Sequence, residues 1–181
     1  MLGRRRQPFE VGESGAQGQS LVEFALVMPI LFFILLGIIQ FGFIFNTYVT
    51  MTNAAREAAR IGTIYQYDGS LSKAQNDAAR NAAVLSSLKA SMNYLSRTAP
   101  EFTNSSSWTS SGGGLTFTDG DLVVTYTVPA GLSDSDPRVG QQITVTATYH
   151  QTLVIPLISA LLPKDGGGRL PLSGQVTMVI N

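Results

Sequence analysis

The sequence contains no cysteine, and only 13% of its 181 residues are charged, with acidic and basic side chains in equal number. The absence of cysteine excludes disulfides, thiolate metal sites and cysteine nucleophiles. The zero net charge argues against a nucleic-acid-binding protein, because such a protein needs a basic face to neutralise phosphates. Basic residues form a run only at Arg4, Arg5 and Arg6, so no nucleic acid is predicted as a partner.

Charge is missing altogether between Glu23 and Arg56. The most apolar part of this stretch, Phe24 to Phe45, has 22 residues. As a helix at about 1.5 Å per residue it extends roughly 33 Å, which matches the ~30 Å hydrocarbon core of a bilayer. The apolar region of a cleaved secretory signal is shorter, about 7–15 residues. The sequence therefore predicts a retained transmembrane helix in contact with membrane lipid.

The arginines on either side of this helix predict its orientation. Three arginines precede it, whereas Arg56 and Arg60 follow it. Because basic residues near a span favour the cytoplasmic side, this bias predicts a cytoplasmic N-terminus. The domain after the helix is then predicted to be extracytoplasmic.

The chain is predicted to have three parts. Residues 1–18 are polar and rich in glycine and glutamine, which is typical of a disordered leader. Residues 19–62 form the transmembrane helix and its extension outside the membrane, as one helix from about Ser20 to about Ile61. Pro29 removes one hydrogen bond from it. Residues 63–181 form an extracytoplasmic α+β domain with a second helix and an antiparallel sheet.

The second helix is predicted to begin at a cap, Ser70 or Ser72, and to end near Arg97. Apolar residues recur along it at steps of three or four, and this stripe is interpreted as its core face. Its members are Leu71, Ala74, Ala78, Ala82, Leu85, Leu88, Met92 and Leu95.

Strands are predicted at residues 121–128, 142–149 and 170–180, because apolar side chains alternate with threonines in the second of them and the others have similar composition. Residues 104–114 are predicted to be a Ser/Gly loop. Residues 153–162 (LVIPLISALL) are too few to span a membrane. This segment either packs into the core, lies on the bilayer surface or contacts a partner.

Glu23 is an ionisable residue at the edge of the apolar helix. A carboxylate there is costly unless it is paired or near the interface, so its position suggests either a function or a place among lipid headgroups. Gly18 lies directly before a five-residue segment that ends in Glu23 and is followed by Phe24. This spacing resembles the processing site of type IV prepilins, which a prepilin peptidase cuts after the glycine.

A wider pattern resembles one family in particular. Residues 19–29 (QSLVEFALVMP) and 52–60 (TNAAREAAR) are similar to TadE-like proteins of tight-adherence (Flp-type) pilus systems. The tail from residue 142 is also similar, though less specifically. The resemblance implies cleavage between Gly18 and Gln19. It also implies that Glu23 and Phe24 take part in helix pairing during assembly, with Glu23 contacting the new amino terminus of a neighbouring subunit.

The family implies a membrane-anchored accessory subunit, a minor pilin or pseudopilin, in the assembly or export of tight-adherence pili. The implied location is the bacterial cytoplasmic membrane, and the implied partners are other pilin-like subunits and pilus-assembly proteins. Small residues such as Gly37, Gly42 and Ala54 would let helices approach one another. The alternative is a single-pass anchor that displays an adhesive or ligand-binding domain and has no role in assembly.

Arg56 and Arg60 are four residues apart and share one helical face with Glu57 beside them. They contact either lipid phosphates or a partner's carboxylates, or else form a solvated ion-pair face. His150 is the only histidine, and a lone histidine after a strand is interpreted as a surface residue. No catalytic activity, metal or cofactor is therefore predicted.

Overall fold

The structure, a computed structural model, describes residues 14–98, 102, 107–134 and 137–181. The chain folds into two compact units, one ending at Ile39 and one running from Gln40 to Asn181. Helix α1 (Ser14–Thr63) is continuous over 50 residues and passes from the first unit into the second. Residues 1–13 of the predicted leader lie outside the described residues, and residues 14–18 belong to α1.

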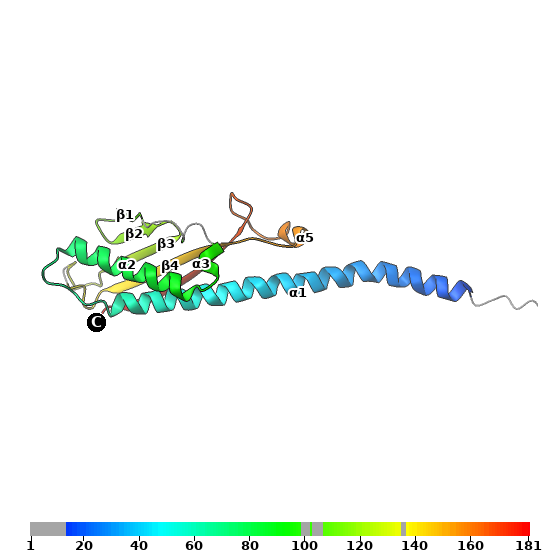
Figure 1. Cartoon of the computed structure of the whole chain (residues 1–181), viewed down its shortest axis with the longest axis horizontal. Coiled ribbons are helices and arrows are strands. Elements are labelled where there is room, and N and C mark those ends of the chain that lie inside the picture. The colour runs from blue at the N-terminus through cyan, green and yellow to red at the C-terminus, as the bar shows by residue number, and fades with distance from the viewer. Residues whose placement is uncertain (1–13, 99–101, 103–106, 135–136) are drawn as a thin grey trace, which may run out of the picture. The chain divides into compact units, whose positions relative to one another are not determined.

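The predicted α+β class is confirmed. Pro29 lies inside α1 without ending it, so the prediction of one continuous N-terminal helix is also confirmed. The second unit adds further helices and a sheet (Figure 1). Among the described residues, α1 is followed by α2 (Lys73–Ser91), α3 (Leu95–Thr98) and α5 (Pro156–Ser159).

The sheet has five strands in the order β1-β2-β3-β4-β5, and every neighbouring pair is antiparallel. The three predicted strands are confirmed as β3 (Leu122–Thr127), β4 (Gln142–Gln151) and β5 (Leu170–Val179). The sheet also has two short strands that were not predicted, β1 (Thr109–Ser111) and β2 (Thr116–Asp119). The first lies inside the predicted loop of residues 104–114, and the second follows that loop. Residues 112–114 between them are glycines with positive φ, a backbone conformation that residues with a side chain rarely adopt.

The core lies between one face of the sheet and the helices of the second unit. Alternate residues of β3 and β4 are buried, as expected for a sheet covered on one face. Four alanines of α1, at positions 54, 55, 58 and 59, are 0% exposed. Ala54 is thus taken up by the core and is not available to a neighbouring subunit's helix, contrary to the prediction.

Gly174 of β5 shows how closely α1 approaches the sheet. A Cβ atom at this position would lie 2.7 Å from the backbone oxygen of Met51 and 3.0 Å from the backbone nitrogen of Thr52. No side chain fits there, because the atoms in the way are backbone atoms. Glycine therefore sets the distance between β5 and this part of α1.

Helix α2 is capped by Ser72, one of the two predicted caps, and the side chains of Ser72 and Gln75 form a capping box. It ends earlier than predicted, at Ser91, because Asn93 takes a positive φ of 52°. The predicted apolar stripe is wrong in its first half, since the alanines at 74, 78 and 82 are exposed. The buried face there carries Asp77, Arg80 and Asn81 instead.

Candidate functional site

The N-terminal part of α1 exposes its apolar side chains on every side. The described chain has one helix long and apolar enough to cross a membrane, and the most apolar window of that helix is entirely unburied. A core helix of a soluble protein would be mostly buried, so this exposure distinguishes α1 from one. One long apolar N-terminal helix of this kind fits a single-pass membrane anchor.

The predicted processing and pairing residues lie in the first turns of this helix. Gly18 and Gln19 are both helical, and a Cβ atom at Gly18 would meet no neighbour within 4 Å. The Gln19 Nε2 atom donates to Glu23 Oε1 at 3.1 Å, and Phe24 is 62% exposed. Glu23 and Phe24 are therefore on the surface of α1, where a second chain could contact them.

The two arginines after the apolar stretch differ in their surroundings. Arg60 donates to both carboxylate oxygens of Glu57, from Nε at 2.9 Å and from Nη2 at 2.6 Å. This hydrogen bonding lowers the pKa of the Glu57 carboxyl and raises the pKa of the Arg60 guanidinium. Arg56 is exposed on the same helix, and the predicted contact of the two arginines with lipid or a partner stays a prediction.

Gln40 was not singled out by the sequence analysis, although it is the most polar side chain between Phe24 and Phe45. It is 0% exposed, and its Oε1 atom accepts from the backbone N–H groups of Val154 at 3.0 Å and Ile155 at 3.2 Å. Seven residues further along α1, the Thr47 hydroxyl donates to Gln151 Oε1 at 2.7 Å. These contacts attach the loop between β4 and β5 to α1.

That loop contains the apolar segment whose role the sequence left open. Of its large apolar residues, Ile158 is buried, whereas Val154, Leu157 and Leu161 are 70%, 63% and 74% exposed. Packing into the core is therefore wrong for most of residues 153–162. Figure 1 shows α5, which lies in this segment, beyond the end of the sheet.

A buried cluster of charges lies between α2 and the β3–β4 connection. The Arg138 side chain is 0% exposed and donates to both carboxylate oxygens of Asp77 at 2.8 Å, and to Asp134 at 2.7 Å. Its guanidinium carbon lies 4.3 Å from the Tyr126 ring centroid. Burial opposes the charge of Arg138, but the Asp77 carboxylate outweighs it and raises the arginine's pKa. Burial also raises the pKa of Tyr126 to about 12.

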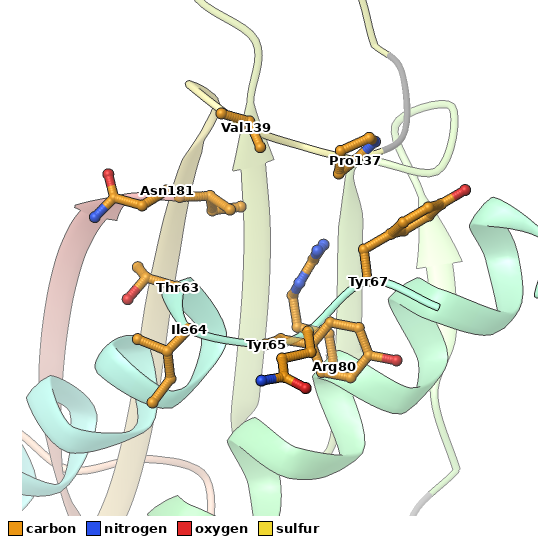
Figure 2. Close-up of a pocket in the computed structure, with 10 residues that line it drawn as sticks. Thr63, Ile64, Tyr65, Tyr67, Arg80, Pro137, Val139 and Asn181 are labelled. Carbon is orange, nitrogen blue, oxygen red and sulfur yellow. The ribbon is translucent and has the colours of Figure 1, made fainter. Parts of the chain in front are cut away.

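A cavity of about 540 Å³ opens beside this cluster, at the end of α1 and of the sheet. Figure 2 shows Arg80 pointing into it between Tyr65 and Tyr67, with Pro137, Val139 and Asn181 around it. Arg80 is 1% exposed, its contact with Asp77 is long at 3.4 Å, and its Nε atom has no hydrogen-bond partner. Among the residues that the structure describes, the lining holds no carboxylate side chain and no histidine.

His150 is not the free surface residue that the sequence predicted. It is 18% exposed and lies between two carboxylates, Asp165 at Nδ1 and Asp121 at Nε2, the second at 3.0 Å. Burial opposes the charged ring, but the two carboxylates outweigh it and raise the pKa of His150. In the described part of the chain, no three His, Cys, Asp or Glu side chains are grouped so that they could hold a metal ion.

Comparisons with known proteins agree with the sequence over the N-terminal helix. No curated protein and no solved structure gives a significant match to the chain. The family model of TadE-like protein matches residues 18–60, which lie within α1, the helix with the exposed apolar surface. That match confirms the resemblance predicted from residues 19–29 and 52–60, and over this part the chain is similar to TadE-like proteins.

Proposed function

We propose that this chain is a membrane-anchored, pilin-like accessory subunit, a minor pilin or pseudopilin, that acts in assembly or export of tight-adherence pili. The observation that carries the proposal is the match to TadE-like protein over residues 18–60, on a helix with an unburied apolar surface. A TadE-like protein is associated with a tight-adherence pilus, and the finer role is our inference. We propose no catalytic activity for it.

The first step of this role is processing. A prepilin peptidase would cut between Gly18 and Gln19, and Glu23 would then be the fifth residue of the mature chain. The new amino group of one subunit could pair with the exposed Glu23 carboxylate of another. Two opposite charges buried together offset much of each other's desolvation, and the pair fixes the stagger of neighbouring helices.

Mass spectrometry of the mature N-terminus tests the processing step. We expect a chain that begins at Gln19 in cells with the peptidase, and a chain that keeps Met1 in cells without it. Met1 retained in both would contradict pilin-type processing. It would favour the alternative, a single-pass anchor that displays a binding domain without a role in assembly.

The subunit is proposed to sit in the bacterial cytoplasmic membrane with its N-terminus in the cytoplasm. The sheet and the helices packed on it would then be extracytoplasmic and would contact other pilus-assembly proteins. Protease treatment of intact spheroplasts is expected to digest this unit. Its protection there, with digestion after lysis as the control, would refute the orientation.

A further inference from the structure

The loop between β4 and β5 has a composition unlike the rest of the second unit. No charged residue occurs between His150 and Lys164. Val154, Leu157 and Leu161 within it are among the most exposed apolar side chains of the unit. A group of large exposed apolar side chains on one short segment indicates a contact surface.

The contacts of this loop with α1 show at what level along the helix it lies. Gln151 is bound at Thr47, and Val154 and Ile155 are bound at Gln40. From Thr47 to Gln40 the helix axis covers roughly 10 Å, at about 1.5 Å per residue. Between these two points lies Phe45, the end of the apolar stretch. The loop therefore begins beyond the apolar stretch and reaches a level within it.

We propose that residues 153–162 are a second membrane contact, inserted into the bilayer beside α1, with Leu157 and Leu161 in the interfacial region of the leaflet nearer the sheet. The occupant of this surface is lipid. The segment continues the apolar surface of α1: Val154 and Ile155 are bonded at Gln40, which lies beside Phe41, and Phe41 and Phe43 are 56% and 52% exposed. This inference rests on the membrane anchoring of α1 in the proposed function, and on no role in pilus assembly.

The backbone of the loop suits an apolar surrounding, where an unpaired N–H group is costly. Gln40 accepts from the N–H groups of residues 154 and 155. Residue 156 is a proline and has no N–H group. The N–H groups of residues 159, 160 and 161 donate to carbonyl oxygens within the same turn. Most backbone donors of the segment are thus satisfied without water.

This placement also explains a polar side chain inside an apolar helix. The amide of Gln40 is costly in hydrocarbon unless it is bonded. Here its side chain is 0% exposed and its oxygen receives two backbone hydrogen bonds from the loop, while its Nε2 atom is buried without a hydrogen-bond partner. Gln40 acts as the attachment point of the inserted segment. Lys164, which follows the segment, is exposed and suited to the headgroup region.

Spin labels on single cysteines test the insertion, because the chain has no cysteine of its own. Leu157→Cys and Leu161→Cys would be labelled in the full chain, reconstituted in phosphatidylcholine–phosphatidylglycerol nanodiscs. Phe43→Cys serves as the membrane reference. Leu132→Cys serves as the aqueous reference, since this residue is also apolar and 48% exposed. Leu132 precedes β4, and the β4–β5 loop follows it. The ten residues of β4, at about 3.3 Å each, therefore separate the reference from the loop.

We expect labels at 157 and 161 to collide more with oxygen and less with a water-soluble nickel chelate than the label at 132. The ratio of the oxygen collision rate to the nickel collision rate at 157 and 161 should shift from the value at 132 toward the value at 43. Equal nickel collision rates at 157, 161 and 132 would overturn the proposal. Dipolar broadening between labels at 157, relieved by dilution with unlabelled chain, would also overturn it, because a second copy would then cover the segment.

A variant in Gln40 tests the attachment. Gln40→Leu keeps α1 apolar but removes the acceptor of two loop N–H groups, so we expect nickel collisions at 157 to increase and the label to gain mobility. Gln66→Leu, an exposed glutamine of the same unit, is the control and should leave the label unchanged. An unchanged label in both variants would refute the role of Gln40. N-terminal mass spectrometry reads the proposed processing independently, so the two proposals can fail separately.

Discussion

Replacing Gly174 by alanine is expected to separate β5 from α1. The added Cβ atom would lie 2.7 Å from the Met51 backbone oxygen and 2.8 Å from its carbonyl carbon. These are backbone atoms of a helix, which cannot move aside as a side-chain end can. Overpacking a close-packed core costs about 1–3 kcal/mol, and we expect a value at the upper end of this range. For a unit of this size, at about 2–4 °C per kcal/mol, the melting temperature should fall by roughly 6–12 °C.

Thermal unfolding of the full chain in detergent, followed by the fluorescence of Trp108, measures the effect. Trp108 is the only tryptophan and packs against the core of the second unit. Gly166→Ala is the matched control, because a Cβ atom there would meet nothing within 4 Å. Gly62→Ala should fall between the two, since its closest neighbour is the flexible end of Ile143. A Gly174→Ala protein with the melting temperature of the wild type would refute the close approach.

Three further changes probe the same unit. Asp77→Ala should destabilise it by about 3 kcal/mol in urea titrations, because the buried Arg138 would lose its buried carboxylate and keep only the partly exposed Asp134 as an ion-pair partner. Restoration by Arg138→Met in the same chain would support this reason. His150→Gln should lower the melting temperature most below pH 6.5, the ordinary pKa of the ring. The difference in melting temperature between wild type and variant should shrink as pH rises through the raised pKa of His150, because the stabilising charge of the ring is then lost. A difference that grows with pH would contradict the ion pairs of His150. Ser72→Ala should cost about 1 kcal/mol of unfolding free energy through loss of the α2 cap, and no change would argue against the capping box.

The sequence was sufficient for the elements whose pattern is local. The apolar stretch of α1 has no charge for more than six turns, and the threonine alternation of β4 has the two-residue period of a strand with one covered face. The cap of α2 could be narrowed to Ser70 or Ser72, since it depends on residues within one turn, and the structure places it at Ser72. Each of these signals lies within a few neighbouring positions of the chain.

The buried face of α2 could not be predicted in this way. Asp77 and Arg80 are charged and would normally face water. They are buried because Arg138, 61 residues after Asp77, supplies the second cation of the cluster. The alanines at 74, 78 and 82 had the helical spacing of a core stripe, but the pattern alone does not reveal a distant ionic partner.

The β1–β2 hairpin and the contacts of Gln40 could not be predicted from the sequence, for related reasons. Residues 109–111 are polar and all exposed, so they give no alternation of apolar side chains. Gln40 could be noted as polar, but its partners are 114 and 115 residues away. In each case the deciding contact is made by tertiary structure.

The strand order has a consequence for how the protein is made. Each strand pairs with the next one along the chain, so the sheet can grow in the order in which the residues are synthesised. A pairing between consecutive strands closes a shorter loop than a pairing between strands that are further apart in the chain, so it costs less entropy. The last strand, β5, is the one whose Gly174 contacts the first helix. The fold therefore closes only when the final residues have arrived, and a chain truncated before Leu170 should remain open to proteases.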